Sequence, residues 1–409
     1  MNLRTSSFAV ALVYYSAVLH AGDITPQVRL ANLHQRVAKR EFAGDKLRLD
    51  ILAFARQQVG TPHYLAAIDL LKQTPSPLDA LDSREIDAED RKLLALPEVA
   101  AYFRAHGRSV AHVAFNSDSS LIATSGWDNV VHLHKFGGKE PASFAKIDAS
   151  PSGIAFHPDG KLLATGCGDT RVIIWNLANN LPKEEHRLGG HKNRPFVVAY
   201  SPTGKMFASG CFDPVLRVLK FDDANPEVWA VLANEKTPSL GIASLAFSHD
   251  GKHLVSGSHI GKESLRIWEV SGDFLNEKTL NAVRARIVSC SPTEPIFAFA
   301  GDDDVVQLMR IGADSVEKLH TIRAHSSKGV PPIVKALAFA PDGRTLATTG
   351  QDKQVRLWNV ATGKSSATWT LPFEPRTLAF ASDGRHLAIG TGDGTVLILR
   401  PTSLSPARP

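Results

Sequence analysis

The sequence predicts an all-β protein built from seven copies of a small antiparallel sheet. A thirteen-residue frame, LATTGQDKQVRLW at 346–358, has the pattern of a strand, a tight polar turn and a second strand. The frame recurs at 122–134, 163–175, 207–219, 297–309 and 387–399, and a seventh copy at 254–268 has a longer turn. Self-similarity at a period of roughly 40–45 residues is typical of repeat arrays in which each unit is one sheet.

An aspartate at the seventh position is the second observation that supports a repeat array. It is present in all six regular copies, as Asp128, Asp169, Asp213, Asp303, Asp352 and Asp393. Because a catalytic carboxylate would not be needed in six copies, we interpret these residues as structural.

Composition is that of an ordinary globular protein. Of 409 residues, 43% are hydrophobic and 21% are charged. The formal charge of +5 is small for this length and argues against a dedicated nucleic-acid binder. Cys167 and Cys211 hold the same slot in adjacent copies, too far apart to bridge, and Cys290 takes a buried aromatic slot. We therefore expect no disulfide framework and no metal knot.

The first segment, residues 1–21, resembles a signal peptide. One arginine precedes an apolar run at 8–19, which is too short to span a bilayer. The alternative is a buried first helix. No later segment approaches the length of a membrane span.

Residues 22–97 predict a helical leader. Apolar residues follow helical spacing at 27–40, 46–59 and 62–73, and an acidic loop or short helix follows at 79–90. This segment offers too little core for independent stability.

Residues 98–402 hold the repeats, and residues 403–409 form a short tail. Each copy begins with a strand that ends on an aromatic slot, followed by a Pro/Asp/Gly turn in which glycine reaches positive φ. These starts lie at 110–118, 153–160, 196–204, 242–251, 287–294, 334–343 and 377–384. Fourth strands are expected at 142–147, 227–233 and 366–371. The last copy ends after its third strand, so we expect residues 99–105 to supply its fourth.

These residues resemble the WD-repeat (WD-40) family over roughly 98–400. The glycine–histidine pair of that family is present as Gly190–His191, with Ala105–His106 and Ala324–His325 as variants. The resemblance implies a seven-bladed β-propeller of four-stranded antiparallel blades, preceded by the helical leader.

The resemblance also implies a buried network of His, Ser or Thr, Asp and Trp within each blade. By position, one copy holds the four residues together: His325, Thr348, Asp352 and Trp358. Partial sets are Thr165, Asp169 and Trp175, and His191, Ser209 and Asp213. His134 occupies the tryptophan position of the first copy.

Motifs of enzymes are absent from the sequence: it has no GxSxG, HExxH, P-loop or CxxC pair. His132 and His134 share a strand face and could ligate a metal, but a structural role is favoured because no third ligand is in view. The carboxylates at 302–304 could bind calcium, although solvated turn residues are the simpler interpretation.

A binding surface is predicted where the innermost strands begin. Arg286, Lys335 and Arg376 lie four residues before the aromatic slot in three successive copies, so they should meet at one rim of the central channel. Trp127 and Phe212 lie in turns on the same face. Arginine and aromatic residues are common binding anchors on loops. The alternative is that the aromatics pack on adjacent loops and the cations are solvated.

The sequence therefore predicts an exported, non-catalytic scaffold that acts as a monomer. Its partner would be a protein or an acidic peptide, with no nucleic acid, no membrane span, no metal and no cofactor. An enzyme or ligand binder that uses the central channel is one alternative, and a cytoplasmic scaffold with an uncleaved N-terminal helix is another. Fold alone does not decide between them.

Overall fold

A computed structural model describes the protein at 99–136, 152–177, 182–213, 215–221, 227–233, 241–258, 264–271, 274–279, 284–313, 315–326, 333–371 and 373–401, with Leu33 and Ile51. The chain divides into two compact units, Met1–Leu96 and Pro97–Pro409. In the first unit, Leu33 and Ile51 have helical backbone and buried side chains. The other predicted leader residues, the signal peptide, the strand at 142–147 and the tail lie outside the described residues. None of the described helical residues belongs to a helix that is long and apolar enough to cross a membrane.

Strands of the second unit form seven sheets within the described residues. The first is three-stranded: β2 (Val110–Phe115), β3 (Leu121–Gly126) and β4 (Val131–Lys135). The second contains β5 (Ile154–Phe156), β6 (Leu162–Gly166), β7 (Val172–Asn176) and β8 (Lys183–Leu188). The third contains β9 (Pro195–Tyr200), β10 (Met206–Cys211), β11 (Val215–Lys220) and β12 (Glu227–Ala233).

The remaining sheets continue in the same way. The fourth contains β13 (Ile242–Phe247), β14 (His253–Ser258), β15 (Arg266–Ser271) and β16 (Phe274–Thr279). The fifth contains β17 (Ile287–Cys290), β18 (Ile296–Ala300), β19 (Val305–Ile311) and β20 (Val316–Arg323). The sixth contains β21 (Val334–Phe339), β22 (Thr345–Gly350), β23 (Gln354–Asn359) and β24 (Ser365–Thr370). The last joins β25 (Pro375–Phe380), β26 (Leu387–Thr391), β27 (Thr395–Leu399) and β1 (Val99–Arg104).

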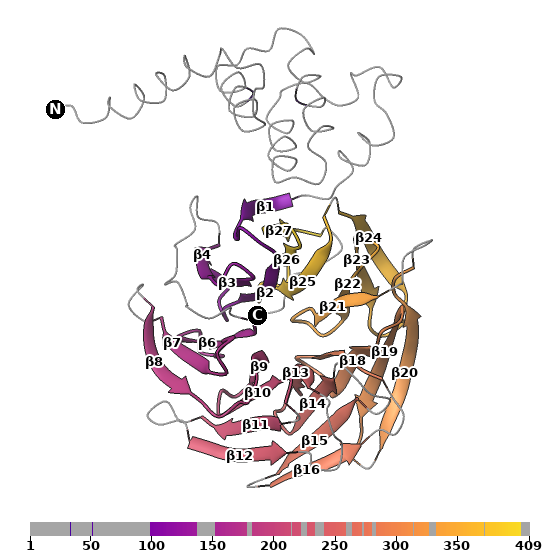
Figure 1. Ribbon diagram of the computed structural model, residues 1–409. Coiled ribbons are helices and arrows are strands. Elements are labelled where there is room, and N and C mark those ends of the chain that lie inside the picture. Colours follow the sequence, from indigo (N-terminus) through magenta and orange to yellow (C-terminus); the bar gives the residue numbers. More distant parts are fainter. Residues whose placement is uncertain are drawn as a thin grey trace, which may run out of the picture. The chain divides into compact units, whose positions relative to one another are not determined.

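The sheets are arranged in a closed circuit, as in a β-propeller (Figure 1). The first strand of each sheet contacts the first strand of the next, in the order β2, β5, β9, β13, β17, β21 and β25, and β25 contacts β2. Every strand pair is antiparallel, for example β22 with β23, where Leu346 lies opposite Trp358. The prediction of an all-β fold of small antiparallel sheets is confirmed, and so are the fourth strands predicted at 227–233 and 366–371, which are β12 and β24.

Glycine is required where β21 turns into β22. Gly343 has a φ of 69°, in the left-handed region where other residues are strained. Gly160 occupies the same position between β5 and β6, with a φ of 76°. The turns predicted from the Asp-Gly pairs are therefore present at both sites.

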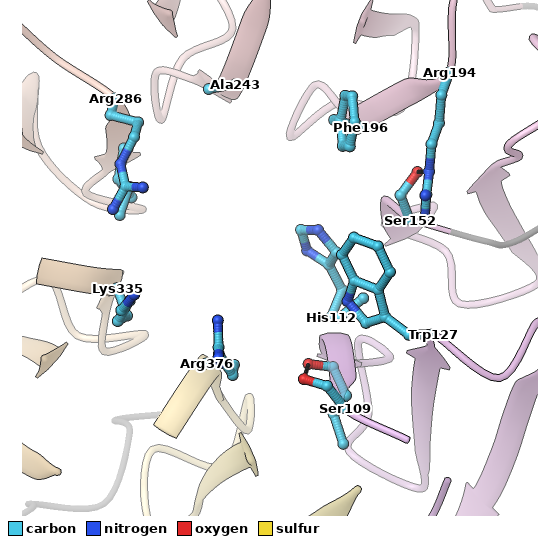
Figure 2. A pocket seen from close by; sticks show the side chains of 13 residues that line it. Ser109, His112, Trp127, Ser152, Arg194, Phe196, Ala243, Arg286, Lys335 and Arg376 are labelled. Carbon is cyan, nitrogen blue, oxygen red and sulfur yellow. Dashed lines mark hydrogen bonds between the residues drawn. The ribbon is translucent and has the colours of Figure 1, made fainter. Parts of the chain in front are cut away.

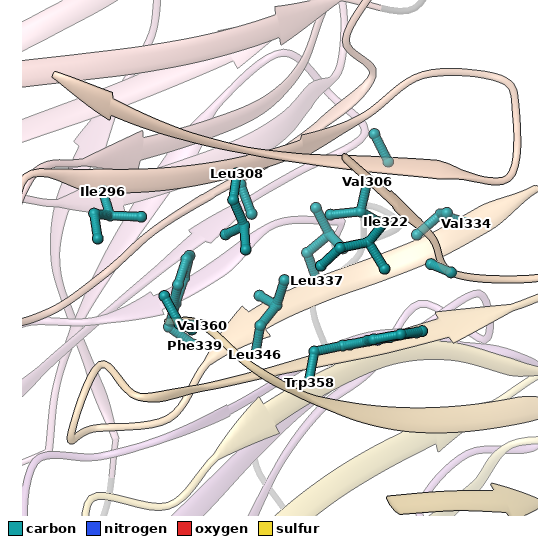
Figure 3. Close-up of a cluster of buried hydrophobic side chains, with 13 residues drawn as sticks. Ile296, Val306, Leu308, Ile322, Val334, Leu337, Phe339, Leu346, Trp358 and Val360 are labelled. Atoms are coloured by element: carbon teal, nitrogen blue, oxygen red, sulfur yellow. The ribbon is translucent and has the colours of Figure 1, made fainter. Parts of the chain in front are cut away.

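The core lies between neighbouring sheets. One buried cluster takes Ile296, Leu308 and Ile322 from the fifth sheet and packs them on Leu346 and Trp358 of the sixth (Figure 3). Five further clusters also draw their members from adjacent sheets. Because each apolar layer needs two sheets to bury it, the sheets stabilise one another around the circuit.

The circuit is closed by strands from distant parts of the chain. β1 pairs antiparallel with β27, with Phe103 opposite Val396. Backbone N–H groups of Ala105 and His106 also donate to the Gly394 carbonyl, at 3.0 and 3.1 Å. The pairing predicted for residues 99–105 is thus present, and it joins the start of the repeats to their end.

Candidate functional site

The four network residues of the sixth sheet are hydrogen-bonded to one another. His325 Nδ1 lies 2.9 Å from Asp352 Oδ1, and His325 Nε2 lies 2.9 Å from Thr348 Oγ1. Trp358 Nε1 donates to Thr348 Oγ1 at 3.0 Å. Asp352 also accepts from the backbone N–H of Gln354 at 3.1 Å. The network thereby ties the β22–β23 turn to two strands of the sheet.

The partial sets form only some of these links. Trp175 Nε1 donates to Thr165 Oγ1 at 3.1 Å, while Asp169 pairs with Arg171. In the third sheet, His191 Nε2 lies 2.8 Å from Ser209 Oγ, but His191 Nδ1 is 3.9 Å from Asp213.

The first sheet has the same three links, with a histidine in place of tryptophan. His106 lies 2.9 Å from both Asp128 and Thr124, and His134 Nε2 lies 3.1 Å from Thr124 Oγ1. The ring of His134 packs on Phe103 at 4.4 Å between centroids. Sequence position identified His134 as the substitute for tryptophan, but did not show that it makes the same hydrogen bond.

Burial of this histidine makes the first sheet sensitive to acid. Burial, with His132 and His106 nearby, lowers the pKa of His134 from 6.5 to about 3. Below pH 6.5 the unfolded chain takes up a proton that the folded chain excludes, so the free energy of unfolding falls as pH drops from 6.5 to 3. At pH 5 the loss from this residue is about 2 kcal/mol.

His134→Trp is expected to remove this loss. Urea unfolding at pH 7.5 and pH 5.0 should show a smaller decline for the variant than for the parent, and comparing the two pH values cancels any packing cost of the larger ring. Trp358→His is the reciprocal control and should make the sixth sheet acid-sensitive. Equal declines in unfolding free energy in the parent and in His134→Trp would show that His134 is not the source of the acid sensitivity.

The predicted metal positions are involved in other interactions. His134 is hydrogen-bonded to Thr124, and Asp302 and Asp304 lie 3.7 and 3.9 Å from arginine nitrogens. Among the described residues, His191, Cys211 and Asp213 are close enough to share an ion. However, the guanidinium of Arg217 lies 2.9 Å from His191 Nδ1 and burial raises the pKa of Cys211 to about 12, so this cluster is poorly suited to a cation.

A cavity of about 260 Å³ opens where the innermost strands begin (Figure 2). Each of the seven sheets contributes the residue four places before its aromatic slot. These residues are Ala111, Ser152, Phe196, Ala243, Arg286, Lys335 and Arg376. The cavity is therefore the mouth of the central channel.

One wall of this cavity is cationic. Arg286, Lys335 and Arg376, which we call the cationic arc, come from the starts of β17, β21 and β25 and lie together on one side (Figure 2). Glu374 forms ion pairs with two of them, at 3.5 Å from Lys335 Nζ and 3.1 Å from Arg376 Nη2. Asp302 lies 3.7 Å from Arg286 Nε.

The opposite wall is a stack of aromatic rings and one guanidinium. Arg194 lies over the rings of Trp127 and Phe196, at 5.0 and 5.3 Å, and Phe196 contacts Phe212 with centroids 4.1 Å apart. We call these four residues the stacked row. Trp127 and Phe212 remain 47% and 44% exposed, so the row presents apolar surface outward. Phe212 does not line the cavity itself.

His112 lies on the cavity wall beside the row (Figure 2). Burial and the nearby Arg194 charge lower its pKa from 6.5 to about 4, so it is neutral at pH 7. Sequence reasoning missed His112, Arg194 and Glu374. Phe196 could have been found from the sequence, because it occupies in the third sheet the same position that Arg286, Lys335 and Arg376 occupy in theirs.

Comparison with known proteins agrees with the sheet pattern. The family model described as WD domain, G-beta repeat, matches residues 98–135, 145–176, 182–219, 232–269 and 316–359. Strands β17–β19 and β25–β27 lie outside these matches and have Met309 and Leu399 in the position of Trp358.

Several curated proteins are similar to this chain at low identity. Topless-related protein 2 of Arabidopsis thaliana is 24% identical over 61% of this chain, which spans only 22% of that relative. Protein groucho of Drosophila melanogaster is 23% identical over 79% of this chain and 42% of its own length. Serine-threonine kinase receptor-associated protein of Gallus gallus is 23% identical over 71% of this chain and 78% of its own length. The names of these relatives describe no enzymatic activity.

Proposed function

Because this chain is a WD-repeat protein, we propose that it is a non-catalytic scaffold that binds an acidic segment of another protein at the mouth of its central channel. The observation that carries the proposal is the placement of the cationic arc, from three consecutive sheets, on one cavity beside the exposed Trp127. Cations at a concave mouth raise the local potential and favour an acidic partner.

The proposal also covers the form in which the protein acts. Its seven sheets are the seven blades of one propeller, which works as a monomer and is exported after removal of residues 1–21. The arginine-then-apolar pattern of those residues supports export. In the alternative, a cytoplasmic scaffold, residues 1–21 are kept as an uncleaved N-terminal helix. The N-terminal residue of protein recovered from its host distinguishes the two, and an intact Met1 would contradict export.

An enzyme that uses the channel is less well supported than a scaffold. General acid–base chemistry needs a group whose pKa lies near the operating pH. Among the described residues on the cavity wall, the histidine is His112, whose pKa is lowered to about 4 by burial and by the Arg194 charge.

Charge reversal tests the proposal. Arg286→Glu with Arg376→Glu should weaken partner binding by about 2–5 kcal/mol. The melting temperature should fall by only about a few degrees, because Arg376 is 45% exposed and Arg286 gives up one hydrogen bond, from Nη2 to the Val334 carbonyl at 3.0 Å. Partners retained from a host extract are first identified. The affinity of an identified partner is then measured for the parent and for the charge-reversed variant. Added salt should also weaken binding, because exposed charges are screened over about 10 Å at 0.1 M.

The matched control is Lys252→Glu with Lys364→Glu. These exposed lysines lie in the β13–β14 and β23–β24 turns, at the other end of the sheets, and the change in net charge is the same. A charge-reversed arc that folds and keeps its partner at full strength would place the binding site elsewhere.

A further inference from the structure

The two walls of the channel mouth differ in chemistry (Figure 2). The cationic arc forms one wall, and Trp127, Arg194 and Phe196 form the facing wall. Among the described residues that line the cavity, every charged side chain at neutral pH is an arginine or a lysine. A ligand that satisfies both walls must therefore carry a negative charge and a flat apolar group.

Charge at the arc is only partly balanced from within the chain. The single carboxylate of Glu374 is shared between Lys335 and Arg376. Asp302, which is 56% exposed, lies 3.7 Å from Arg286, too far for a hydrogen bond. Arg286 Nε is buried and has no hydrogen-bond partner within the described residues. Glu374 shows that the arc accepts a carboxylate, and the arc keeps an excess of positive charge for another.

The stacked row is held in place before any partner arrives. Arg194 Nε donates to Ser152 Oγ at 3.2 Å, and Ser152 Oγ donates to the Pro195 carbonyl at 2.5 Å. The backbone N–H of Trp127 donates to the Ser109 carbonyl at 3.0 Å, which fixes the turn that carries the indole. A preorganised surface of this kind loses little side-chain entropy on binding. An incoming aromatic ring would extend the row through ring–ring and cation–π contacts.

Size limits what enters the cavity. About 260 Å³ lies below the usual range of small-molecule pockets, roughly 300–1,000 Å³. The cavity therefore has room for about one or two side chains, and the rest of a bound segment must lie outside, where Trp127 and Phe212 are exposed.

From these observations we infer that the partner segment has an acidic residue next to an aromatic residue. The acidic side chain enters the cavity against the cationic arc, and the aromatic ring packs on the stacked row. This inference rests on the proposed function, because it specifies the ligand of the same site. Single-stranded nucleic acid also combines charge with stacking. However, the net charge of +5 is small, and the cations surround one cavity instead of following a groove.

A set of four unlabelled hexapeptides, acetylated at one end and amidated at the other, tests the inference with the full chain. Between glycine–serine flanks, the central pair is glutamate–phenylalanine, glutamine–phenylalanine, glutamate–alanine or glutamine–alanine. Isothermal titration calorimetry should show glutamate–phenylalanine binding at least tenfold more tightly than either singly changed peptide. An unlabelled oligothymidine should not displace it.

Two variants test whether the acidic residue of the peptide contacts the cationic arc and whether its aromatic residue contacts the stacked row. Arg286→Gln with Arg376→Gln should abolish the preference for glutamate and leave the preference for phenylalanine. Trp127→Ser with Phe212→Ser should do the reverse. Lys252→Gln with Lys364→Gln is the control and should change neither preference, and thermal melts confirm that all variants are folded.

Several results would overturn the inference. They are a lack of binding by all four peptides at millimolar concentration, preferences that persist in the variants, and displacement by the oligothymidine. The protein partner separates this failure from failure of the proposed function. If the charge-reversed arc loses that partner but the serine variant keeps it, the acidic–aromatic inference fails and the scaffold proposal stands. If the charge-reversed arc keeps the partner, both fail.

Discussion

Deletion of residues 99–105 is expected to destabilise the whole ring. The deletion removes β1, which pairs with β27 along its length, and it removes the Ala105 hydrogen bond to Gly394. It also takes Phe103 out of the cluster that packs the first sheet on the last. We expect a loss on the order of 5 kcal/mol or more from these hydrogen bonds and this apolar burial. The melting temperature should fall by roughly 10 °C or more.

Calorimetry and light scattering measure the outcome of this deletion. The buried strand β27 would gain an open edge, so aggregation through it should accompany the loss of a cooperative transition. Deletion of the seven residues at 403–409 is a control of equal length. A 99–105 deletion that melts like the parent would show that β1 does not close the ring.

Trp358→Ala is expected to cost roughly 3–5 kcal/mol of unfolding free energy. The indole is 7% exposed, packs in the cluster between the fifth and sixth sheets and donates to Thr348. Asp352→Ala should cost less, about 1–3 kcal/mol, because it leaves His325 without its carboxylate partner and buries no large cavity.

Urea unfolding of both variants provides the test, with Trp358→Phe as the control. The phenylalanine variant keeps most of the apolar contact and loses the hydrogen bond, so it separates the two contributions. Small and equal effects of Trp358→Ala and Asp352→Ala would mean that the network does not stabilise the sixth sheet.

Much of the fold was predictable because the repeat makes local and global patterns agree. In β23, Val355 and Leu357 are buried while Arg356 between them is less so, which is the alternation expected of a strand; the buried Trp358 that follows Leu357 departs from it. The closing strand was predictable by elimination, since the last copy lacked a fourth strand and residues 99–105 alternate correctly. The cationic arc was predictable because equivalent slots in a ring must meet at one rim.

The rest of the site depends on contacts between sheets that no local pattern encodes. Arg194 reaches the stacked row from the start of the third sheet, while Trp127 comes from a turn of the first. Their contact depends on the curvature of the ring and on the rotamers of both side chains. Glu374 lies just before β25, outside every repeated slot, so its pairing with Lys335 across two sheets had no signal in the sequence. The leader, the signal peptide and the strand at 142–147 remain predictions.

The pairing of β1 with β27 also has a consequence for biosynthesis. β1 is among the first parts of the ring to leave the ribosome and its partner is among the last. At about 5–20 residues per second, β1 waits on the order of 15–60 s for its partner. A chain that stops early, or is cut before Thr395, has no strand with which β1 can pair. Closure of the ring therefore depends on synthesis reaching β27: chains that contain β27 cover the edge of the last sheet, and chains that end before it expose an unpaired edge to proteases and chaperones.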